Sequence, residues 1–107
     1  MIRCAYTRLS SPDDLSPNPR NPNTHPQAQI EALAHIIEQD GWRHPIVVSR
    51  QSGYIVAGHG RLAAAHLLGL ESVPVDEQDF DSPEAELAAL IADNRLAELS
   101  EMDTTAL

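Results

Sequence analysis

The segment that most restricts the fold runs from Tyr54 to Gly69, where an apolar stretch turns through two glycines directly into an Ala-rich helix. Residues 54–57 predict a strand, and a second predicted strand over 45–49 is expected to pair with it as a hairpin. Gly58-His59-Gly60 forms the turn, and the helix is expected to begin at about Arg61. The sequence therefore predicts a helix N-terminus placed directly at the end of a sheet strand.

A second helix is predicted upstream of this segment. Apolar residues recur every three or four positions between Ile30 and Ile37, which is typical of a helix with one buried face. Thr24 and Gln27 have the spacing of a capping box, so this helix is expected to begin near residue 24 or 25. Gly41 is expected to end it.

The remaining segments complete a small fold. Residues 2–9 predict a short strand, and the Pro- and Asn-rich residues 10–26 predict an ordered loop with at most one helical turn. Residues 73–75 predict a strand at the edge of the sheet, because the proline in it cannot donate to a ladder. Pro83 is expected in the first turn of a third helix. This order of elements predicts a small single α+β domain with a mixed sheet and three main helices.

Length and composition agree with one soluble domain. The chain has 107 residues, of which 42% are hydrophobic, which is enough for one modest core. The apolar runs are too short for a membrane span or a signal peptide, so we expect no membrane partner and a cytoplasmic location. The single cysteine allows no internal disulfide and no multi-cysteine zinc site.

The charge is distributed unevenly along the chain. Seven arginines, with no lysine, face 16 acidic residues, which gives a formal net charge of −9. Residues 1–75 are neutral, and the whole excess lies in residues 76–107. This argues against a surface that coats DNA through its phosphates, but it allows one concentrated anion pocket in the neutral part. The acidic helical end, residues 82–107, is expected to form a helix whose charged face lies in solvent.

The start of the Ala-rich helix is the strongest candidate site. The first N–H groups of a helix have no intrahelical partners, and with the macrodipole they favour an anion. Gly58 and Gly60 lack Cβ atoms, which would let a phosphate approach the backbone before Leu62. The positive charge of Arg61 at this helix start is expected to destabilise the helix by about 0.3–1 kcal/mol unless an anion is bound. The alternative for this segment is an ordinary tight turn with a solvated arginine. His59 would either donate to a phosphate or act as an acid/base near pH 7, or it would cap its own helix start.

Two polar clusters could face the same site. Asn18-Pro19-Arg20-Asn21 is a stiff loop that presents an arginine and two amides. Asp93 and Asn94 join a carboxylate to an amide, which suits Mg²⁺ carrying substrate phosphates. An ordinary polar turn and an ordinary helix end are the alternatives for these two clusters.

The motifs, taken in order, resemble the N-terminal domain of ParB, a member of the ParB/sulfiredoxin superfamily that is often labelled a ParB-like nuclease domain. The resemblance covers residues 5–100, and its most specific part is the run Ile55-Val56-Ala57-Gly58-His59-Gly60-Arg61-Leu62. Residues 18–22, 41–48 and 91–98 match further family motifs in the same order. The signature A-G-H-G-R-L is similar to a branch found in phage and mobile-element proteins, often beside DNA methyltransferases.

The resemblance implies that residues 1–107 are a ParB-like nucleotide-binding domain for CTP or ATP with Mg²⁺. It assigns the metal to Asp93 and Asn94, and the nucleotide to a set of seven residues: Arg20, Gly58, His59, Gly60, Arg61, Leu62 and Asn94. Partition ParB proteins carry G-E-R-R where this chain has G-H-G-R, which leaves the choice of base and hydrolysis open. Sulfiredoxin activity is not expected, because the required cysteine is absent from this turn.

Three functions are compatible with this sequence. The first is a nucleotide-binding domain that acts in DNA partition, DNA modification or mobile-element maintenance, with DNA bound through other domains of a longer chain and with a homodimer as its assembly. The second is an enzyme, either an NTPase or the nuclease of the family label. A nuclease would normally hold its metals with several carboxylates. The third is an interaction module with a vestigial pocket, whose acidic helix binds a partner.

Overall fold

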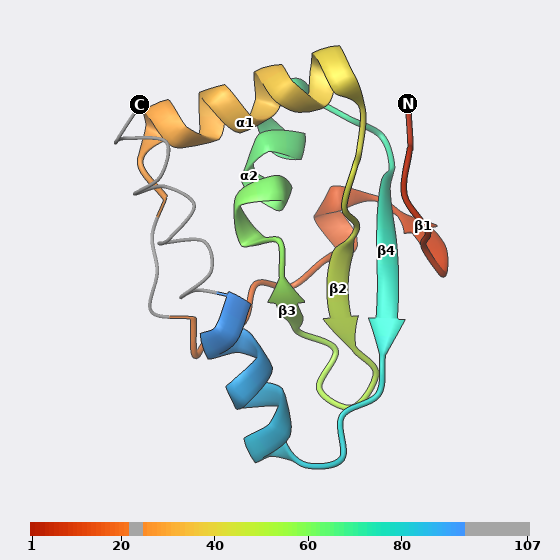
Figure 1. Cartoon of the computed structure of the whole chain (residues 1–107), viewed down its shortest axis with the longest axis vertical. Helices are drawn as coiled ribbons and strands as arrows, with labels where there is room; N and C mark the ends of the chain where they lie inside the picture. Colours follow the sequence, from red (N-terminus) through yellow and green to blue (C-terminus); the bar gives the residue numbers. More distant parts are fainter. Residues whose placement is uncertain (22–24, 94–107) are drawn as a thin grey trace.

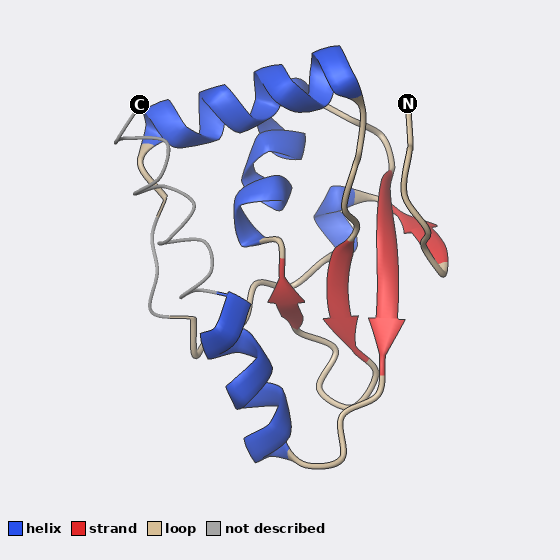
Figure 2. Cartoon of the chain, in the orientation of Figure 1, coloured by secondary structure: helices blue, strands red, loops and turns tan. Residues whose placement is uncertain are grey.

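The computed structural model of the chain describes residues 1–21 and 25–93. Figures 1 and 2 show a sheet with helices gathered at one end and along one side. The elements in chain order are β1 (Arg8–Ser10), the 3-10 turn η1 (Pro12–Asp14), α1 (Gln27–Asp40), β2 (Ile46–Ser49), β3 (Ile55–Ala57), α2 (His59–Leu68) and β4 (Val73–Gln78). A further helical segment covers residues 83–93.

The four strands form one mixed sheet in the order β1-β4-β2-β3. β2 pairs antiparallel with β3 and parallel with β4, and β4 pairs antiparallel with β1. The β2–β3 hairpin and the predicted α+β class with a mixed sheet and three main helices are confirmed. β3 is an edge strand, and it leads directly into α2 (Figure 1).

The prediction that the strand containing Pro74 lies at the edge of the sheet is wrong. β4 lies between β1 and β2. It tolerates the proline because its pairing with β2 begins only at Val75, opposite Ile46. Pro74 therefore lies outside the ladder to β2, and its partner in the sheet is Leu9 of β1.

The limits of two other elements also differ from the prediction. α1 begins at Gln27 rather than near residue 24, and its N-cap is Pro26, whose carbonyl accepts from the N–H groups of Gln29 and Ile30. The predicted cap, Thr24, lies outside the described residues. Of residues 2–9, only the last two join a strand, because β1 covers Arg8–Ser10.

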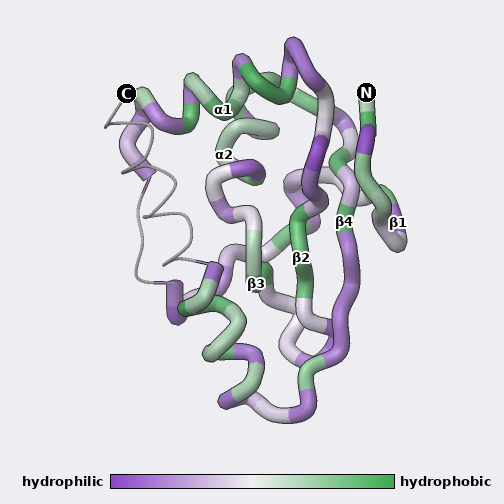
Figure 3. The backbone as a smooth tube through the Cα atoms, viewed as in Figure 1, coloured by the Kyte–Doolittle hydropathy of each residue, from purple (hydrophilic) through white to green (hydrophobic). Residues whose placement is uncertain are grey.

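The core lies between the sheet and the paired helices α1 and α2. Ile46, Ile55 and Val75 are fully buried in the sheet, and Ala34 and Ile37 bring the predicted apolar face of α1 onto them. In Figure 3 the start of β4 is apolar and its end is hydrophilic, so the core is concentrated at the end of the sheet where α2 begins. Within the part of the chain that the structure describes, no helix has both the length and the apolar character to span a bilayer.

Candidate functional site

α2 begins at His59, two residues before the predicted start, with Gly58 as its N-cap. Gly58 has φ +98° and ψ +25°, a left-handed conformation that glycine adopts most readily. His59, Gly60 and Arg61 therefore form the first helical turn. The first hydrogen bond of the helix joins the N–H of Leu62 to the carbonyl of Gly58 at 3.0 Å, so the three N–H groups before it have no intrahelical partner.

Arg61 points back over the start of its own helix. Its Nη1 atom lies 3.4 Å from the position that a Cβ on Gly58 would take. The side chain is half-buried and has no ion pair with any carboxylate in residues 1–21 or 25–93. Burial lowers the pKa of Arg61, and the negative charge of Asp93 opposes this only in part. A cation without an ion pair thus lies at the positive end of a helix, where a bound anion would stabilise it.

The two glycines of the turn also have a packing role that the sequence did not indicate. A Cβ on Gly58 would lie 3.3 Å from Cα and Cγ1 of Ile46, and a Cβ on Gly60 would lie 3.4 Å from His25 and Leu33. Both glycines therefore allow close packing of the turn against protein atoms. The interpretation that they make room for a phosphate is not needed to explain them.

His59 connects the helix start to the loop that contains Arg20. Its Nε2 atom accepts a hydrogen bond from the backbone N–H of Asn18 at 3.0 Å. A backbone N–H only donates, so Nε2 carries the lone pair and the proton of the neutral ring is on Nδ1. Nδ1 is buried and has no hydrogen-bond partner among the residues described. An unpaired buried donor costs about 1–3 kcal/mol.

The sequence did not reveal this connection, because Asn18 and His59 are 41 positions apart. Burial lowers the pKa of His59 from its ordinary value of 6.5, with His25 adding to this effect and Asp93 opposing it. His59 therefore remains neutral at pH 7. The alternative that it caps its own helix is wrong, because α2 has no side-chain cap.

Arg20 is exposed, two residues beyond the contact between Asn18 and His59. The turn that contains it is well ordered by hydrogen bonds, since Asn18 Oδ1 accepts from the N–H of Arg20 at 2.9 Å. The structure thus brings the Asn18 turn to the helix start, but it leaves the arginine of that turn in solvent.

Asp93 is the last described residue of the helical segment 83–93, and Asn94 lies outside the described residues. Asp93 acts electrostatically on both His59 and Arg61, so the structure brings these three predicted site residues together. No cluster of three or more His, Cys, Asp or Glu side chains that could hold a metal by itself occurs in 1–21 and 25–93. A carboxylate near an anion site does fit Mg²⁺ that is carried in by phosphates.

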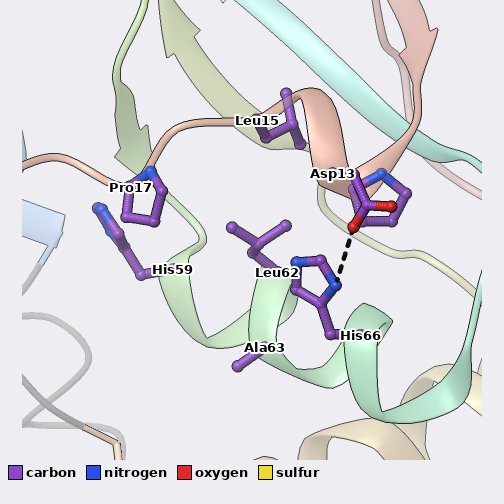
Figure 4. A pocket seen from close by; sticks show the side chains of 8 residues that line it. Asp13, Leu15, Pro17, His59, Leu62, Ala63 and His66 are labelled. Atoms are coloured by element: carbon purple, nitrogen blue, oxygen red, sulfur yellow. Dashed lines mark ion pairs between the residues drawn. The ribbon is translucent and has the colours of Figure 1, made fainter.

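A cavity of about 380 Å³ runs along α2 on the side of η1. Figure 4 shows His59 and Pro17 at one end of this cavity, Leu62 in its middle, and His66 at the other end, with Nδ1 3.6 Å from Asp13. This cavity was not predictable from the sequence, because its two walls come from separate segments of the chain. The ring of His59 thus lies between the cavity and the start of the helix.

The lowered pKa of His59 predicts acid destabilisation. Between the two pKa values the unfolded chain binds the proton and the folded chain does not, so stability rises with pH. The contribution is fully present above pH 6.5 and is lost as the pH falls through the lower pKa of the folded state. One proton gives a slope of at most about 1.4 kcal/mol per pH unit.

Urea unfolding between pH 5 and pH 8 measures this slope. We expect a shallower slope for His59→Gln than for the unaltered chain and for His35→Gln, which removes an exposed histidine from α1. Equal slopes in all three proteins would contradict the prediction.

The fold and the helix start together place this chain among the small α+β domains that present a helix N-terminus at the end of a sheet strand. The family model described as the ParB N-terminal domain matches residues 7–94. The chain belongs to this family.

Relatives and solved structures agree with this assignment. The chain is 44% identical over 62 residues to the ParB-like nuclease domain-containing protein YnaK of Escherichia coli, covering 58% of this chain and 70% of that protein. It is 36% identical over 95 residues to Stage 0 sporulation protein J of Bacillus subtilis, covering 84% of this chain and 33% of that protein. A crystal structure of C-terminally truncated chromosome-partitioning protein ParB from Caulobacter crescentus, complexed with CTP-gamma-S, aligns with a TM-score of 0.69 and 32% identity, covering 81% and 51% of the two chains. The chain thus spans about a third of the partition protein from Bacillus subtilis and most of YnaK.

Proposed function

We propose that this chain binds a nucleoside triphosphate, CTP or ATP, with its phosphates at the first turn of α2. Arg61 carries the proposal, because it is a half-buried guanidinium without an ion pair in the described part of the chain, at a helix start with free N–H groups. Phosphate oxygens would accept from both kinds of donor. The CTP-gamma-S complex of the Caulobacter protein, which is 32% identical to this chain, supports a nucleotide at this fold.

The other candidate residues have defined parts in this proposal. Gly58, Gly60 and Leu62 form the turn against which the phosphates would lie, and His59 and Arg20 would border the nucleotide. Asp93 and Asn94 would hold Mg²⁺, which neutralises phosphate charge when it is bound. In this proposal the whole chain, residues 1–107, is one nucleotide-binding domain.

We place this binding in DNA partition, DNA modification or mobile-element maintenance. The support is the family itself, whose relatives include proteins named for chromosome partitioning and nucleoid occlusion. DNA would be bound by other domains of a longer chain, since the acidic composition of this one disfavours contact with phosphates along a duplex.

Isothermal titration calorimetry of the chain with CTP, ATP and the corresponding monophosphates, with Mg²⁺ or with EDTA, tests the proposal. We expect at least one triphosphate to bind about tenfold or more tightly than its monophosphate, because each added charge-assisted hydrogen bond contributes about 1.5–3 kcal/mol. We also expect EDTA to weaken triphosphate binding. Equal affinity for cytidine monophosphate and CTP, or no binding of any triphosphate at millimolar concentration, would contradict the proposed site. A phosphate-release assay on the same samples separates a binding domain from an NTPase.

A further inference from the structure

The turn that contains Arg20 is attached to the rest of the molecule through Asn18. The backbone N–H of Asn18 donates to Nε2 of His59 at 3.0 Å, and Asn18 is only 6% exposed. The two oxygen atoms of Asn18 accept hydrogen bonds within its own turn. Its Oδ1 atom accepts from the N–H of Arg20, and its carbonyl accepts from the N–H of Asn21 at 3.1 Å. His59 is therefore the contact that fixes this turn to α2.

The loop has a second attachment upstream of this turn. The N–H of Ile55, the first residue of β3, donates to the carbonyl of Ser16 at 3.0 Å. Ser16 is thus fixed to the sheet, and the residues after it are fixed to the helix. Because the two attachments are separate, loss of the His59 contact would weaken the hold of α2 on the Asn18 turn without detaching Ser16.

The His59 ring can accept this hydrogen bond only in its neutral form, because an imidazolium ion has no lone pair on Nε2. The ring lies in a setting with both positive and negative groups, contributed by four different segments. His25 precedes α1 and Asp93 ends the helix 83–93, and both act on the ring electrostatically. Further titratable or charged groups on the elements around it are Arg61 and His66 on α2, Asp13 and Asp14 of η1, and Glu84 and Glu86 of the helix 83–93.

We infer that His59 is a positioning residue that holds the Asn18 turn beside the start of α2 while its ring is neutral. The inference rests on the proposed function, because the turn matters only if a nucleotide binds at this helix start. His59 would act through the turn and not by touching the reacting atoms. By accepting from the N–H of Asn18, Nε2 of His59 holds the turn in position, and this position determines how Arg20 and Asn21 can contact a nucleotide.

Two variants of His59 separate positioning from general support of the fold. His59→Gln keeps an acceptor but does not titrate, and His59→Leu has similar bulk but no acceptor. His35→Gln is the control, since His35 is an exposed residue of α1. Amide hydrogen exchange by NMR reports on the Asn18 N–H in the absence of any ligand, and calorimetry with CTP and Mg²⁺ at pH 7.5 reports on the site.

In His59→Leu we expect the protection of the Asn18 N–H to fall about tenfold and CTP affinity to fall about five- to tenfold, the value of one neutral hydrogen bond. His59→Gln is expected to keep most of the Asn18 N–H protection and most of the CTP affinity. In the unaltered chain the Asn18 protection should also fall as the pH drops below 6.5, whereas in His59→Gln it should not. His35→Gln should match the unaltered chain in every measurement.

These measurements distinguish failure of the His59 inference from failure of the proposed function. If His59→Leu loses Asn18 protection but keeps its CTP affinity, the inference is wrong and the proposed function stands. If His59→Gln and His59→Leu are equally impaired, His59 only supports the fold and the inference is wrong. If the unaltered chain binds no triphosphate, the proposed function itself is wrong, and the inference falls with it.

Discussion

Replacing Arg61 with methionine is expected to weaken binding of a nucleoside triphosphate by about 10- to 100-fold, which corresponds to the loss of a charge-assisted hydrogen bond. The same change is expected to leave the free energy of unfolding of the unliganded chain unchanged or to raise it by up to about 1 kcal/mol. Methionine keeps the apolar stem of the side chain but removes the charge. In the unliganded chain that charge is half-buried and opposes the helix dipole, and Asp93 compensates for it only in part.

Arg61→Met is informative because it is expected to weaken triphosphate binding without lowering the stability of the unliganded chain. Affinity is measured by calorimetry with CTP or ATP and Mg²⁺, and stability by urea unfolding without ligand. Arg43→Met is the matched control, because Arg43 is exposed and its ion pair with Asp40, at 3.3 Å, is also exposed. Such pairs contribute little, so we expect both quantities to stay close to those of the unaltered chain. If affinity and stability fall together in Arg61→Met, Arg61 is a structural residue. If neither changes, the anion site is not at this helix start.

The sequence predicted those parts of the fold that depend on local signals. The apolar repeat of α1, the β2–β3 hairpin and the strand–glycine–helix turn all follow from neighbouring residues, and each is present in the structure. The place of β4 in the sheet depends instead on pairing with distant segments. Pro74 suggested an edge strand, but the ladder to β2 starts one residue later, at Val75. A one-residue register of this kind is fixed by tertiary packing and has no local signature.

In the candidate site too, local features were predictable from the sequence and contacts between distant residues were not. Arg61 in the first turn of α2 was predictable, because a cation at a helix start conflicts with the dipole and so calls for an explanation. The bond between His59 and Asn18 was not predictable, since it joins residues 41 positions apart. The packing of Gly58 was not predictable for a related reason. Its neighbour in space is Ile46 on β2, so the missing Cβ is explained by contact with another strand.

The second large effect is expected from Gly58→Ala, which should lower the free energy of unfolding by about 2–5 kcal/mol. Part of this loss is the cost of a left-handed conformation for a residue with a Cβ, about 1–2 kcal/mol. The rest comes from overpacking, which typically costs about 1–3 kcal/mol. The new methyl group would lie 3.3 Å from the backbone Cα of Ile46, which cannot move without shifting β2, and 3.4 Å from Nη1 of Arg61.

Gly69→Ala provides the matched control at the other end of the same helix. Gly69 is also left-handed, with φ +66° and ψ +34°, but a Cβ there would meet nothing within 4 Å. The two variants share the backbone cost and the reduced entropy of the unfolded chain, so their difference in urea unfolding isolates the contact of the turn with Ile46 and Arg61. We expect Gly58→Ala to be less stable than Gly69→Ala by about 1–3 kcal/mol and to bind CTP more weakly even when fully folded, because the methyl group displaces the guanidinium from the helix start. Equal stability of the two variants would mean that β2 does not constrain the turn, and that the position of Arg61 is set by α2 alone.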